Sequence, residues 1–149
     1  MLAGAGKATL VFGDILPFDG FDGVLHPLYV RVLVVEAQNS VQARSRVCLV
    51  SVEVTSLKQS AVTSLRSMAA RIAQCGIESV WVCVTHTFSA PHIRTPEHLI
   101  SQEDGEKNDR LIQTCKIAVK KAVIQAVGSM QKARFSWGIA PAEINVNRD

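Results

Sequence analysis

Hydrophobic positions along the chain follow two spacings, and the difference between them predicts its strands and helices. Residues 28–37, L-Y-V-R-V-L-V-V-E-A, and residues 46–54, R-V-C-L-V-S-V-E-V, are rich in β-branched side chains and predict two strands. The connection between them is short, so we expect the two strands to pair as a hairpin. The second strand is apolar almost throughout, which predicts burial on both of its faces.

Two stretches have apolar residues at the three- and four-residue spacing of a helix. Residues 56–75 carry this pattern at Ala61, Leu65, Met68 and Ile72, and Gly76 is expected to end the helix as its C-cap. The second stretch begins near Asn108 or Asp109, either of which could act as the N-cap, and extends to about Met130.

Shorter apolar runs predict three further strands, over residues 8–12, 79–85 and 134–139. Residues 17–23 and 89–107 lack periodicity and contain proline and glycine, so we expect loops there. Together these elements predict an α/β fold. It would be a mixed sheet of about five or six strands with at least two packed helices, in a single domain over residues 1–149.

Composition narrows the class of protein further. The 149 residues are 48% hydrophobic and 19% charged, which is typical of a globular domain. The net charge is only +3, and aromatic residues make up 5%, so we expect no nucleic-acid partner. No apolar run approaches the roughly 18 residues that a membrane span requires. The N-terminus does not read as a signal peptide, and the four cysteines form no C-x-x-C pair, so we expect reduced thiols and a cytoplasmic location.

The candidate chemistry lies where the apolar run of residues 79–85 stops. The sequence there is T-H-T-F-S-A-P-H, which places His86 at the end of a buried strand. A histidine in this position can ligate zinc, act as a general base, or form a hydrogen bond within a core. His92 follows six residues later and could converge with His86. Glu53, near the end of the strand over 46–54, is a candidate carboxylate and needs a partner if it is buried.

The order of these landmarks resembles the N-terminal part of the neutral/alkaline (non-lysosomal) ceramidase superfamily. The segment T-H-T-F-S-A-P at 85–91 resembles that family's T-H-T-H-S-[AG]-P motif, which is the most specific of the similarities. Weaker similarities lie at G-D-I-L-P (13–17, against D-I-T-P), L-H-P-L-Y-V-R (25–31, against D-P-L-Y-x-R), V-S-V-E (50–53, against V-S-x-D) and N-V-N-R (145–148).

The resemblance implies a zinc amidohydrolase scaffold. The first histidine of the family's motif is a zinc ligand, which corresponds to His86. The second is Phe88 here, and His92 could replace it. The family's other ligands and its catalytic serine belong to later segments that this chain does not contain. We therefore expect a second polypeptide, or another copy of the chain, to supply the remaining site residues; the chain could instead be a fragment of a longer protein or a small relative that has lost the chemistry.

The sequence thus predicts one half of a metal-dependent hydrolase that acts on a C–N (amide) bond of a small molecule. In this hypothesis His86 and His92 bind zinc, and His92 and Glu53 take part in catalysis. The residues expected to contact substrate are Thr87, Phe88 and Ser89. The alternative is a non-catalytic binding or structural subunit on the same scaffold, which the replacement of a motif histidine by Phe88 favours.

Overall fold

The computed structural model describes residues 1–37 and 45–143. In this part of the chain, five strands form one sheet in the order β4-β3-β2-β1-β5. The strands are β1 (Leu2–Thr9), β2 (Tyr29–Ala37), β3 (Ser45–Val52), β4 (Val80–Val84) and β5 (Gln131–Lys132), and the helices are α1 (Gln59–Ala73) and α2 (Gln102–Gly128). Strands β3 and β4 are parallel, whereas the other neighbours are antiparallel. The predicted α/β fold, with a mixed sheet and two packed helices, is therefore confirmed.

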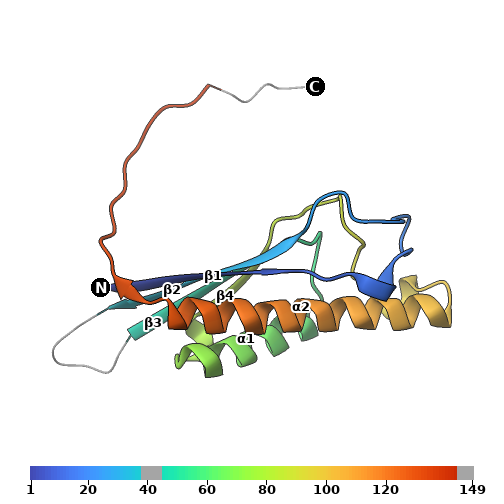
Figure 1. Cartoon of the computed structure of the whole chain (residues 1–149), viewed down its shortest axis with the longest axis horizontal. Helices are drawn as coiled ribbons and strands as arrows, with labels where there is room; N and C mark the ends of the chain where they lie inside the picture. The colour runs from blue at the N-terminus through green and yellow to red at the C-terminus, as the bar shows by residue number, and fades with distance from the viewer. Residues whose placement is uncertain (38–44, 144–149) are drawn as a thin grey trace.

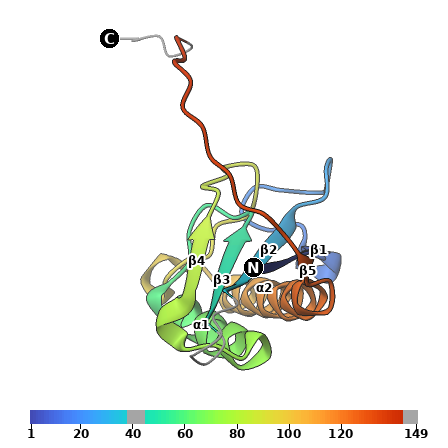
Figure 2. The same cartoon turned by 90° about the vertical axis from the view of Figure 1, so that its left-hand side faces the viewer.

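Both helices cover the same face of the sheet, as Figures 1 and 2 show. Helix α2 packs along β1 and β2, and α1 packs beside β3 and β4. The inward side chains of β2 and β3, such as Val34 and Val50, are fully buried against the helices. The hairpin of β2 and β3 is confirmed, but burial of β3 on both faces is wrong. Val47 and Leu49 point away from the helices and are exposed, because no element in the described residues covers that side.

Strand β1 is the element that sequence patterning misplaced. It spans Leu2–Thr9 rather than residues 8–12, and it consists largely of alanine and glycine. Gly4 and Gly6 face α2 so closely that a Cβ atom at Gly6 would lie 1.9 Å from the carbonyl oxygen of Ala122. These glycines weaken the local strand signal, yet they allow the helix to rest directly on the strand backbone.

The helix boundaries also differ from their predicted positions. Helix α1 ends with Gln74 in the left-handed conformation (φ 55°), whereas Gly76 has φ −66°, so the predicted C-cap is wrong. Helix α2 begins at Gln102, and the hydroxyl of Ser101 accepts the backbone N–H of Asp104 at 3.1 Å. Ser101 is therefore the N-cap, which leaves Asn108 buried within the helix.

The strand predicted over residues 134–139 is not formed. β5 pairs with β1 only at Leu2 and Ala3, after which the N–H of Ala133 donates to the carbonyl of Met1. Within the described part of the chain, residues 134–143 belong to no strand. Residues 133–143 extend away from the sheet on the side opposite the helices (Figures 1 and 2). The N-V-N-R similarity at 145–148 lies outside the described residues.

The cysteines are unpaired in the structure. Burial raises the pKa of Cys48 to about 11 and that of Cys115 to about 12, so both remain neutral thiols and pack as small hydrophobic side chains. None of the helices in the described part of the chain combines the length and the apolar character needed to cross a bilayer.

Candidate functional site

His86 lies immediately beyond β4, in a left-handed backbone conformation with φ 57°. Its Nδ1 atom is 2.8 Å from the carbonyl oxygen of Thr55. A carbonyl can only accept, so Nδ1 carries the hydrogen and Nε2 remains available as an acceptor or metal ligand. The Thr55 hydroxyl also donates to the carbonyl of Thr87 at 2.6 Å. The segment after β3 therefore fixes both the ring of His86 and the loop that carries it.

His92 is held by a carboxylate from a distant part of the chain. Asp19 Oδ2 accepts the backbone N–H of His92 at 2.7 Å and lies 2.7 Å from His92 Nδ1. The other carboxylate oxygen accepts Nε of Arg94 at 3.1 Å and a second hydrogen bond from the same guanidinium. The Asp19 side chain is 7% exposed, so two residues of the loop after β4 close over a buried carboxylate.

Asp19 reaches this position through a tight turn. Phe18 and Phe21 exchange two backbone hydrogen bonds of 3.0 Å, and the residues between them, Asp19 and Gly20, both have positive φ. An Asp-Gly pair suits such a turn, because aspartate tolerates the left-handed region and glycine adopts it freely. Phe18 is buried beneath the turn and anchors it to the core.

The pKa of Asp19 lies below its ordinary value of 3.8. Burial alone would raise this pKa. The hydrogen bonds from the His92 backbone and from the side chains of Arg94 and His92 outweigh burial, because they stabilise the ionised form. Asp19 is thus a permanent anion near neutral pH, able to orient His92 and to stabilise a positive charge on its ring.

Phe88 separates the two histidines. Its ring centroid is 5.0 Å from that of His86 and 6.3 Å from that of His92, both in edge-on arrangements. The Phe88 side chain is largely exposed. Across residues 1–37 and 45–143, no three histidine, cysteine or carboxylate side chains gather closely enough to hold a metal ion. His86 and His92 therefore lie on the same loop without forming a complete metal site in the described residues.

Glu53 follows β3 directly. Its side chain contacts β2, on the side of β3 away from β4 and His86. One carboxylate oxygen accepts the backbone N–H of Tyr29 at 2.7 Å, and the other forms an ion pair with Arg31. Glu53 thus has the partner expected of a partly buried carboxylate. Its catalytic role stays a prediction, and it would have to act beside the Arg31 guanidinium.

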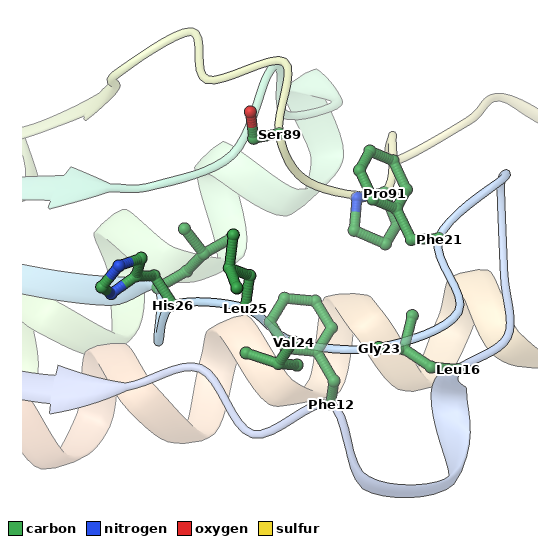
Figure 3. A pocket seen from close by; sticks show the side chains of 10 residues that line it. Phe12, Leu16, Phe21, Gly23, Val24, Leu25, His26, Ser89 and Pro91 are labelled. Carbon is green, nitrogen blue, oxygen red and sulfur yellow. The ribbon is translucent and has the colours of Figure 1, made fainter.

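An apolar pocket of about 310 Å³ opens next to the loop after β4 (Figure 3). Ser89 and Pro91 contribute to its wall, but Thr87 and Phe88 do not. The remaining lining residues are Phe12, Leu16, Phe21, Gly23, Val24, Leu25, His26 and Leu28. Of the three residues predicted to contact substrate, only Ser89 therefore lines this pocket.

Thr55, Asp19 and Arg94 are the site residues that sequence reasoning missed. The Asp-Gly pair between two phenylalanines signals a tight turn. No local pattern, however, reveals that Asp19 meets His92, which is 73 residues away in the sequence. The partners of both histidines become visible only in the folded chain.

No model of a known protein family matches this sequence, and no curated protein is significantly similar to it. The ceramidase resemblance therefore rests on the motifs alone and stays a prediction.

We expect Asp19→Asn to destabilise the protein by about 1–3 kcal/mol, since a buried acceptor of charge-assisted hydrogen bonds is lost. Because the pKa of Asp19 is lower in the folded state than 3.8, its contribution is complete above that value and disappears as the pH falls through the folded pKa. Urea unfolding at several pH values measures this. The gap between wild type and variant should narrow below about pH 4. A gap independent of pH would contradict the assignment.

Proposed function

We propose that this chain is the ligand-bearing half of a metal-dependent hydrolase that cleaves a C–N (amide) bond in a small molecule. The observation that carries this proposal is the state of the two histidines on the loop after β4. Nδ1 of His86 donates to the Thr55 carbonyl and Nδ1 of His92 contacts the Asp19 carboxylate, which leaves Nε2 free on each ring. Metal-binding histidines characteristically have this arrangement, in which the second nitrogen is held by a carbonyl or a carboxylate.

Each imidazole fits zinc by itself, but two imidazoles are fewer than the three protein ligands of a catalytic zinc site. The proposal therefore requires a second polypeptide that brings further ligands to His86, with His92 as a ligand or as the acid/base group. When bound, zinc would polarise a substrate carbonyl and lower the pKa of a coordinated water to about 7.

The residues of this chain have definite tasks in such a site. The Thr55 carbonyl keeps the His86 ring oriented. Asp19 holds His92 Nδ1, so that Nε2 can accept a proton and the resulting charge faces a buried anion. The pocket beside Ser89 offers an apolar surface for the part of the substrate that does not react.

A non-catalytic binding subunit is the second candidate, and the apolar pocket favours it. The pocket exists without any contribution from His86 or His92 and is lined almost entirely by apolar side chains. A ligand could therefore bind there whether or not a metal site is completed nearby. The Phe88 ring between the histidines also fits a scaffold that binds without catalysing.

Metal analysis of the protein purified together with its partner separates the two functions. We expect about one zinc per assembly for wild type, and a loss of zinc affinity of more than about 100-fold for His86→Ala. His98→Ala is the matched control. His98 is exposed, and in the described residues its ring has polar contacts with its neighbours Thr95 and Glu97, so its removal should leave the zinc content unchanged. Unchanged zinc in His86→Ala would contradict the metal site, and a metal-free wild-type assembly would favour the binding subunit.

A further inference from the structure

The face of the sheet opposite the helices carries a continuous apolar row. The pairing register aligns Ala5 with Leu33, Leu33 with Leu49 and Leu49 with Trp81, across strands β1, β2, β3 and β4. All four of these side chains point away from the helices. Leu33 and Leu49 are 40% and 37% exposed, and Trp81 is 63% exposed. We call these four residues the apolar row.

Val35 and Val47 widen the row on one side, since they pair with each other on the same face. Aligned apolar side chains on neighbouring strands are the usual inner surface of two-layer packing. An apolar area of this kind on a folded domain marks an interaction surface.

The segment after β5 offers a complementary element. Residues 133–143, which we call the tail, carry Phe135, Trp137 and Ile139 at alternate positions. In an extended chain these three side chains share one side. They are 75%, 79% and 89% exposed, so none of the residues that the structure describes covers them.

The tail does not cover the row of its own sheet. β5 runs antiparallel to β1 as far as Ala133, and from there the tail rises off the sheet instead of lying on its own row (Figure 1). It also leaves on the side opposite the helices and extends outward (Figures 1 and 2). Its three apolar side chains therefore stand clear of the row of their own sheet, where the row of another molecule can meet them.

We propose that a second copy of this chain covers the open face, with the tail of each copy lying across the apolar row of the other. The dimensions agree. Phe135 to Ile139 spans about 13 Å when extended, and three neighbouring strands from Leu33 to Trp81 span about 10 Å. The contact is reciprocal, as a two-fold symmetric dimer requires.

The exposed apolar area of row and tail is large enough for a stable dimer. Trp81, Phe135 and Trp137 contribute large rings of roughly 150–250 Å² each, most of which is exposed. Two copies of these rings, together with the aliphatic side chains of row and tail, reach the roughly 1,200–2,000 Å² typical of stable interfaces. The proposal concerns the sheet face and does not depend on the function of the loop after β4.

Light scattering across a range of concentrations tests the dimer with the complete chain. We expect a wild-type dimer. Phe135→Ser with Trp137→Ser (the tail variant) should raise its dissociation constant at least about 100-fold, as should Leu33→Lys with Leu49→Lys (the face variant). Ile117→Ser with Ile124→Ser is the matched control, because it removes two exposed apolar side chains from α2 and should leave the dimer intact.

Mixing the two disrupted variants tests the exchange itself. The face variant keeps an intact tail and the tail variant keeps an intact row, so an equimolar mixture should form a heterodimer with one of the two contacts. The two tryptophans of the chain are both in the proposed contact, so their emission should shift to longer wavelength on dilution of wild type. A monomeric wild type, or a dimer that survives the tail variant, would overturn the proposal. The tail variant keeps this test valid if the lysine substitutions prevent folding.

Discussion

Gly6→Ala is expected to destabilise the protein by about 3 kcal/mol or more, because a single added carbon overpacks the contact between β1 and α2. The new Cβ would lie 1.9 Å from the carbonyl oxygen of Ala122 and 2.8 Å from the backbone nitrogen of Ala126. Both are main-chain atoms of a long helix, so neither can turn aside as a flexible side chain would. Strand and helix would have to separate, which would open the core around Val119 and Val123.

The free energy of unfolding in urea measures this effect, and Gly128→Ala is the matched control. Gly128 ends α2, and apart from its own helix backbone and chain neighbours no described atom lies within 4 Å of its Cβ position, so alanine there should be neutral or stabilise by about 0.4–1 kcal/mol. If Gly6→Ala unfolded within about 0.5 kcal/mol of wild type, the close approach of helix and strand would not exist in solution.

Glu36→Ala is expected to cost about 3–5 kcal/mol, since it leaves the Arg46 guanidinium buried without its anion. The two residues are directly paired on β2 and β3, with Nε of Arg46 2.6 Å from the Glu36 carboxylate. Their side chains are 6% and 9% exposed, and Arg46 also donates to the carbonyl of Ala73 at 2.8 Å. This carbonyl belongs to the last residue of α1, so the ion pair also anchors that helix to the sheet.

Urea unfolding again provides the measurement, with Glu103→Gln as the control. The Glu103 side chain is 73% exposed and pairs with Lys107 one turn along α2, and Lys107 also donates to the carbonyl of Pro17, so the loss of the Glu103 charge should change stability by less than about 1 kcal/mol. Replacing the pair together, by Glu36→Leu with Arg46→Met, should recover much of the loss because no unpaired charge remains. Equal effects at Glu36 and Glu103 would show that the Glu36–Arg46 pair is solvated in solution.

The candidate site lies at the carboxyl ends of β3 and β4. Thr55 follows β3 and His86 follows β4, and the parallel pairing of these strands brings both residues to one end of the sheet. Side chains commonly gather for binding and chemistry where the carboxyl ends of neighbouring parallel strands meet. The tie between Thr55 and His86 is therefore a direct product of the strand order.

Local periodicity determined the central elements of this protein. The β-branched runs over 28–37 and 46–54, and the apolar run over 79–85, correspond to strands β2, β3 and β4. The helix predicted over 56–75 contains α1 with a few residues to spare. These elements can be predicted because each one buries a single face. Burial of one face places apolar residues at every second position of a strand, or at three- and four-residue spacing in a helix, and this spacing is visible in consecutive residues.

Tertiary structure decided the features that depend on distant partners. A strand of alanine and glycine exists because α2 lies on it, and Asn108 is a buried side chain because its Oδ1 accepts the N–H of Arg94 at 2.8 Å. β5 pairs with β1 only at Leu2 and Ala3, and within the described residues the outer face of β3 is uncovered because both helices pack on the other side.

Part of the candidate site could be predicted from the sequence, and part depends on the tertiary structure. The position of His86 at a strand end is readable from the sequence, because the apolar run stops there. The groups that orient His86 and His92, the Thr55 carbonyl and the Asp19 carboxylate, come from segments far away in the chain. Sequence spacing records only neighbours along the backbone, so the partners of a side chain are set when strands and turns pack together.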